Sequence, residues 1–177
     1  FKTTATQGNL NNHIGVPLTL LSITNATEIG IVEMGANHQK EIEFLSNICE
    51  PDFGYITNFG KAHLEGFGGI EGVIKGKSEL YTYLKNNHKT AFVNPNDTKQ
   101  LELTEDISRI LLNKSVSILK SQPFLSIQYK NQTIQTHLVG DYNLNNIIVA
   151  ISIGEHFKIR TQNIMNAIEN YIPTNNR

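Results

Sequence analysis

The feature that most constrains the fold is an alternation of strand-like and helix-like segments in the first half of the chain. Short runs rich in β-branched residues alternate with segments whose apolar residues recur at helical spacing. The strand-like runs are 28–34, 53–57 and 90–93, and the helix-like segments are 38–49 and 71–84. Strands joined through single helices predict a mostly parallel sheet with helices on its faces.

The pattern changes in the second half of the chain. Turn signals at Gln122-Pro123 and Asn131-Gln132 separate three short strand-like runs, 115–120, 124–129 and 133–139. Short strands joined by tight turns predict a small antiparallel meander. Two helices are then expected, at 143–157 and 161–171. The glycines of 66–72 are expected to form a loop, and the 177 residues are expected to form one domain.

Composition excludes several classes of partner. The chain has 15 Lys and Arg against 16 Asp and Glu, a net charge of −1, which predicts no nucleic-acid partner. Its apolar runs are shorter than the roughly 20 residues that a membrane span needs, so no membrane partner is expected. One cysteine, Cys49, excludes an internal disulfide and predicts a cytoplasmic protein.

Polar residues lie where the first two predicted strands end. Glu33 closes the first strand, Asn58 closes the second, and His63 and Lys77 follow. In open α/β sheets, ligands bind beyond the carboxyl ends of the strands. A carboxylate and an imidazole there can share Mg²⁺, which keeps several waters for substrate phosphates. Taken singly, Glu33 also fits a satisfied strand-end carboxylate, and His63 an ordinary loop histidine.

The segment Gly72-Val73-Ile74-Lys75-Gly76-Lys77-Ser78 only superficially resembles a phosphate-binding loop. That motif needs four residues between its glycines, and this segment has three. It also needs a strand directly before it and a helix directly after it, whereas these residues lie within a helical pattern. We therefore predict that the segment is not a phosphate loop.

A further cluster opens the first helix of the second half. Asn143 and Asn146 are three residues apart, so they share one face of that helix. Their amides offer a donor and an acceptor, which suits the edge of a purine, although an asparagine-rich helix cap is the ordinary alternative. Arg177 can reach phosphate or ribose, or can be solvated.

These clusters, in this order, resemble the Mur ligase family. The resemblance covers nearly the whole chain and rests on four blocks: Asn9 to Leu21, Glu33-Met34-Gly35-Ala36-Asn37-His38, Ala62 to Gly68, and Gly140-x-x-Asn143-x-x-Asn146. It implies a P-loop-type central domain over residues 1–177. It also implies that a strand and the phosphate loop precede residue 1 in the parent protein, and that further domains flank this one.

The resemblance assigns roles residue by residue. Glu33 and His63 would bind Mg²⁺, and Lys77 would be carbamylated by CO₂ and hold a second metal ion. Lys75 competes for that role, but Lys77 keeps the family spacing to an aromatic residue. Nucleotide contacts would come from Asn58, Asn143, Asn146 and Arg177, and substrate contacts from Thr6, Asn9, Asn11 and Asn12. Tyr142 departs from the family pattern, which has a histidine there.

The implied activity is ATP-dependent amide formation in peptidoglycan synthesis. D-alanyl-D-alanine would be added to UDP-N-acetylmuramoyl-tripeptide through an acyl phosphate, by a monomeric enzyme. The 177 residues alone would be inactive, because the phosphate loop is not among them. Two alternatives stay open: another ligase of the Mur or folylpolyglutamate type, and a non-catalytic nucleotide-binding domain.

Overall fold

The structure, a computed structural model, describes residues 1–60 and 64–173. The chain divides into two compact units, Phe1–Ile110 and Leu111–Arg177. The assignment of residues 1–177 to one domain stays a prediction. In the described residues, no helix is both long enough and apolar enough to cross a membrane.

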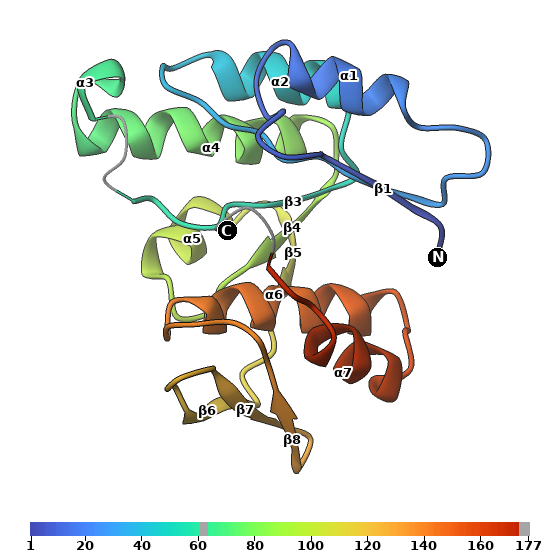
Figure 1. The fold of residues 1–177 in the computed structure, drawn as a ribbon. Helices are drawn as coiled ribbons and strands as arrows, with labels where there is room; N and C mark the ends of the chain where they lie inside the picture. Colours follow the sequence, from blue (N-terminus) through green and yellow to red (C-terminus); the bar gives the residue numbers. More distant parts are fainter. Residues whose placement is uncertain (61–63, 174–177) are drawn as a thin grey trace. The chain divides into compact units, whose positions relative to one another are not determined.

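The first unit alternates strands and helices, as predicted (Figure 1). Its elements are β1 (Thr3–Ala5), α1 (Gly15–Leu21), β2 (Ile29–Ile31), α2 (Glu41–Cys49), β3 (Phe53–Tyr55), α3 (Leu64–Phe67), α4 (Ile70–Asn86), β4 (Thr90–Val93), α5 (Thr98–Leu103) and β5 (Ser108–Leu111). Five of these, β1, α1, α3, α5 and β5, were not expected from the sequence. Each has only three to seven residues, too few for a periodic pattern to show.

The strands of the first unit form two sheets rather than the single sheet that was predicted. β1 pairs with β2, and β3, β4 and β5 form the other sheet in that order. The β1–β2 and β3–β4 pairs are parallel, which confirms the predicted direction. The strand predicted at 28–34 is shorter than expected. Past Ile31, the backbone N–H of Glu33 donates to the Thr6 side chain instead of continuing the ladder.

The glycine-rich segment is more ordered than the sequence suggested. Instead of a loop over 66–72, it contains α3, a turn at Gly68 and Gly69 with φ of 74° and 108°, and the start of α4. A Cβ atom on Gly72 would lie 1.8 Å from the Phe67 carbonyl oxygen. The glycine therefore lets α3 pack closely on α4. The false phosphate loop lies inside α4, as predicted.

The core of the first unit lies between α4 and the β3–β4 sheet. Its buried residues are Ile42, Ile56, Leu80, Tyr81, Leu84, Ala91, Val93 and Ile107. Leu80 and Leu84 are four residues apart, so the same face of α4 covers the sheet. This packing fixes the strand ends relative to α4, the helix that carries Lys77.

The second unit confirms the predicted meander and both predicted helices. β6 (Val116–Lys120), β7 (Ser126–Tyr129) and β8 (Gln132–Gln135) pair antiparallel in chain order. The helices α6 (Asn143–His156) and α7 (Thr161–Glu169) follow. One apolar cluster joins the sheet to both helices, and it includes Ile127, Tyr129, Ile134, Ile151, Ile164 and Met165.

Candidate active site

Glu33 lies two residues beyond β2 and is held from two sides. Its backbone N–H donates to the Thr6 hydroxyl at 2.8 Å, and the backbone N–H of Thr6 donates to the Ile31 carbonyl at 3.0 Å. The Asn11 side-chain amide donates to Glu33 Oε1 at 2.9 Å. The structure thus brings three sequence-predicted residues, Thr6, Asn11 and Glu33, to one strand end. The Glu33 side chain is exposed.

Asn12 and Asn9 have different surroundings from Asn11. The Asn12 side-chain oxygen accepts from the backbone N–H groups of Ile14 and Gly15, both at 3.0 Å, and so fixes the turn into α1. Asn9 is exposed, and its backbone carbonyl accepts from the Asn11 N–H at 2.8 Å. Asn12 therefore has a structural task in addition to any contact with a substrate.

Lys77 and Asn58 meet at the end of β3. Lys77 Nζ donates to the Asn58 backbone carbonyl at 2.6 Å and lies 3.5 Å from its side-chain oxygen. That side-chain oxygen also accepts from the Gly60 N–H at 2.8 Å, which orders the loop. Burial lowers the pKa of the Lys77 ammonium group, because a charged amine is less stable away from water. At a given pH, a larger fraction of Lys77 is therefore the neutral amine than of a solvated lysine.

Two predicted site residues, His63 and Arg177, lie outside the described residues. The joint metal site that the sequence predicts for Glu33, His63 and Lys77 therefore stays a prediction. Within residues 1–60 and 64–173, no three side chains of His, Cys, Asp or Glu gather as a metal-binding group.

Asn143 and Asn146 lie together at the start of α6 in the second unit. The Asn146 amide donates to Asn143 Oδ1 at 3.0 Å, and the Asn143 amide donates to the Val139 carbonyl at 2.9 Å. The shared helix face predicted for them is confirmed. Beside them, the Tyr142 ring packs over Gly140 and is 75% exposed.

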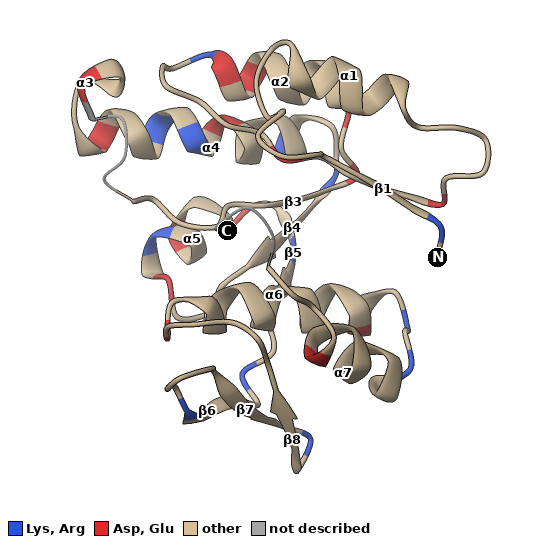
Figure 2. Cartoon of the chain, viewed as in Figure 1, with Lys and Arg blue, Asp and Glu red and all other residues tan. Residues whose placement is uncertain are grey.

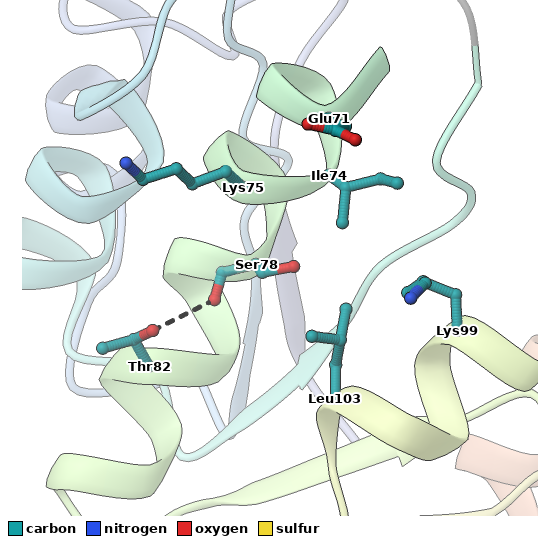
Figure 3. A pocket seen from close by; sticks show the side chains of 7 residues that line it. All are labelled: Glu71, Ile74, Lys75, Ser78, Thr82, Lys99 and Leu103. Atoms are coloured by element: carbon teal, nitrogen blue, oxygen red, sulfur yellow. Dashed lines mark hydrogen bonds between the residues drawn. The ribbon is translucent and has the colours of Figure 1, made fainter.

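A hollow of about 420 Å³ lies between α4 and α5 (Figure 3). Its lining is Glu71, Ile74, Lys75, Ser78, Thr82, Lys99 and Leu103. Lys75, the competing candidate for carbamylation, is therefore the one predicted residue in the described lining. The Lys75 side chain is exposed and extends away from α5, and it donates no hydrogen bond to a strand end among the residues that the structure describes. The surroundings of Lys77 therefore distinguish it from Lys75.

The sequence interpretation missed the role of Glu79, two residues after Lys77. Its carboxylate accepts from the backbone N–H groups of Lys40 at 2.6 Å and Glu43 at 3.0 Å, at the start of α2. An acidic residue at a helix N-terminus is a common stabilising contact. Here the carboxylate comes from another helix, so no local sequence pattern indicates the contact.

Comparisons with known proteins agree with this architecture. Residues 1–154 match the Mur ligase middle domain family. The UDP-N-acetylmuramoyl-tripeptide–D-alanyl-D-alanine ligase of Haemophilus influenzae is 48% identical over 82 residues, which are 46% of this chain and 18% of the relative. The ligase of the same name from Buchnera aphidicola subsp. Acyrthosiphon pisum is 36% identical over 173 residues, 94% of this chain and 35% of the relative.

The fold is also similar to that of a solved structure. The crystal structure of MurF from Acinetobacter baumannii superimposes with a TM-score of 0.82 at 26% identity, over 98% of this chain and 41% of that one. The chain spans well under half the length of the relatives that it matches.

Proposed function

Because the chain belongs to the Mur ligase family and matches its middle domain, we propose that it forms the ATP-handling part of a longer ligase. That enzyme adds D-alanyl-D-alanine to UDP-N-acetylmuramoyl-tripeptide. The names of the relatives support the substrates. One structural observation supports the chemistry most directly: a carboxylate, Glu33, and an amine of lowered pKa, Lys77, are each held just beyond the end of a parallel strand.

The proposed reaction proceeds in two steps. The terminal carboxylate of the tripeptide attacks the γ-phosphorus of ATP, which forms an acyl phosphate and releases ADP. The amine of D-alanyl-D-alanine then attacks the acyl carbon, loses a proton and displaces inorganic phosphate. Two anions must approach each other in the first step, so the protein has to offset their repulsion.

The described residues fit a magnesium ion by their chemistry. Mg²⁺ prefers oxygen donors and takes one or two carboxylates together with substrate phosphates. Glu33 supplies such a carboxylate, and the Asn11 amide that donates to it is uncharged. When bound, the ion neutralises charge on the phosphates. We propose Glu33 and His63 as its protein ligands.

Lys77 is proposed to react with CO₂. The neutral amine attacks the carbon, a proton leaves the nitrogen, and a carbamate anion forms that can hold a second metal ion. Burial favours this step, because it raises the fraction of neutral amine at a given pH. Asn58 holds Lys77 in place through its carbonyl oxygen.

The remaining predicted contacts belong to the same proposal. Asn143 and Asn146 face the adenine, and Asn58 and Arg177 contact other parts of the nucleotide. Thr6, Asn9 and Asn12 contact the acceptor substrate, and Asn11 lies in the same segment. The enzyme works as a monomer in this proposal.

The test uses the full-length protein that contains this chain. We expect ADP release that requires both UDP-N-acetylmuramoyl-tripeptide and D-alanyl-D-alanine, and that single amino acids or glutamate do not support. Replacing Glu33 by Ala should lower kcat/KM by about 100-fold or more, the usual effect of losing a transition-state charge contact. Full activity in Glu33→Ala would favour a non-catalytic domain, and turnover with glutamate would favour a different ligase.

A further inference from the structure

Asn11 forms hydrogen bonds to Glu33 and Gly35, the two residues that flank Met34 just beyond the end of β2. Its side-chain amide donates to Glu33 Oε1 at 2.9 Å, and its backbone carbonyl accepts from the Gly35 N–H at 2.7 Å. Two bonds to residues that flank one position fix the orientation of Asn11 as well as its distance. Asn11 is half-buried, whereas Glu33 is exposed. The amide therefore holds the carboxylate from its less exposed side.

Gly35 makes this approach possible. A Cβ atom at position 35 would lie 2.8 Å from Asn11 Nδ2 and 2.9 Å from its Cγ, closer than such atoms pack. Gly35 does not have a positive φ, so its backbone conformation does not require glycine. The feature that requires glycine here is the space occupied by the Asn11 amide.

The chemistry of the contact suits a carboxylate that has to bind a cation. A neutral amide N–H orients the carboxylate without cancelling its charge, whereas a lysine or arginine would compete with a metal ion. Groups that orient metal ligands in this way commonly change metal affinity by 10- to 100-fold when they are removed.

We propose that Asn11 is a positioning residue, which holds the Glu33 carboxylate in the orientation that binds the divalent cation. This role rests on the proposed function, and it differs from the substrate contact that the sequence suggested for Asn11. The two roles predict different measurements: a positioning residue changes metal affinity, and a substrate contact changes the KM of the uridine nucleotide.

The experiment measures Mn²⁺ binding to the full-length protein by electron paramagnetic resonance, in the presence of the β,γ-methylene analogue of ATP. We expect Asn11→Ala to raise the Kd of Mn²⁺ about tenfold, with the KM of UDP-N-acetylmuramoyl-tripeptide unchanged within about twofold. Gln7→Ala is the matched control. Gln7 lies in the same loop, and its side-chain amide donates to the Ala5 carbonyl at 3.1 Å. The Gln7→Ala variant should therefore bind Mn²⁺ with the wild-type Kd.

A double-mutant cycle with Gly35 tests the mechanism. Gly35→Ala should weaken Mn²⁺ binding as Asn11→Ala does, because the added methyl displaces the amide. In the Asn11→Ala background the same methyl has room, so Gly35→Ala should add little. Equal effects of Gly35→Ala in both backgrounds would overturn the proposed contact.

Glu33→Ala separates this inference from the proposed function. If Glu33→Ala weakens Mn²⁺ binding and Asn11→Ala does not, the positioning role is wrong and the metal site stands. If neither variant changes the Kd, both proposals fall. An Asn11→Ala variant that raises only the KM of the uridine nucleotide would restore the substrate role in place of positioning.

Discussion

At the scale of single residues, environment separates side chains that the sequence presents as alike. Lys75 and Lys77 are two residues apart on one helix, yet in the described part of the chain only Lys77 donates a hydrogen bond to a strand-end carbonyl. Burial lowers the pKa of the Lys77 ammonium group. In the second unit, Glu155 accepts hydrogen bonds from Tyr129 and Asn113 and pairs with Lys130 at 2.9 Å. Lys77 and Glu155 each lead to a prediction about protonation.

Lys77→Arg should lower kcat/KM of the full-length ligase by about 100-fold or more. Arginine retains a positive charge and a donor for the Asn58 carbonyl, but it is not neutral at any working pH and does not form the carbamate. Steady-state kinetics with both substrates measures the effect. Lys75→Arg tests the competing assignment: a larger loss in that variant than in Lys77→Arg would move the modified lysine to position 75.

Glu155 should make the second unit sensitive to acid. Burial alone would raise the pKa of this carboxyl, but hydrogen bonds from Lys130, Tyr129 and Asn113 lower it below the ordinary 4.5. A lowered folded-state pKa stabilises the fold above pH 4.5, and this contribution disappears as pH falls through the folded-state value.

Urea unfolding of the chain at pH 7 and pH 3.5 measures this contribution. Glu155→Gln should destabilise the second unit on the order of 1 kcal/mol at pH 7. The difference from wild type should shrink at pH 3.5, because below pH 4.5 the carboxyl of the unfolded chain gains a proton and the stabilisation from the lowered folded-state pKa declines. A difference that does not change with pH would show that the charge of Glu155 contributes nothing.

At the scale of elements, the start of α2 is held by a side chain from another helix. The N-terminus of α2 has no side-chain cap of its own, and Glu79 on α4 accepts its Lys40 and Glu43 N–H groups. Figure 2 shows acidic and basic residues interspersed along α2 and α4. Glu79 therefore links the helix that carries Lys77 to the segment that follows β2.

Glu79→Ala should destabilise the first unit by about 1–2 kcal/mol, because two N–H groups at a helix start lose their acceptor. Glu79→Gln should cost less, since the amide oxygen still accepts one bond. Denaturant midpoints at constant m-value give both numbers. Thr82→Ala on the same helix is the control, because its exposed hydroxyl bonds only the Ser78 carbonyl of α4 itself. A loss in Thr82→Ala equal to that in Glu79→Ala would contradict this account.

At the scale of the whole molecule, each unit has its own apolar core. The first core consists of residues between Ile42 and Ile107, and the second of residues between Val116 and Ile168. A chain with two separate cores can lose one without losing the other. Stability is therefore better described for each unit than by one value for the chain.

Ile151→Ala tests this separation. Ile151 is fully buried on α6, so removing its side chain should cost the second unit about 2–5 kcal/mol. Hydrogen exchange followed by mass spectrometry should show faster exchange in β7 and α6 and unchanged exchange in β3 and β4. Equal acceleration in both units would mean that the cores unfold together.

The sequence by itself determined the order of the main elements and the family. Its apolar periodicity is local information, so α2, α4, β4 and both helices of the second unit were predicted close to their observed bounds. The shared face of Asn143 and Asn146 was predictable for the same reason, because helix geometry sets the spacing of residues three apart.

Only the tertiary structure decided which distant residues meet. The bonds from Asn11 to Glu33, from Lys77 to Asn58 and from Glu79 to the start of α2 join residues 19 to 39 positions apart. Such contacts depend on how strands and helices pack, which no local pattern records. The division of the strands into two sheets has the same origin, because pairing partners are chosen by the packing of the whole unit rather than by each strand.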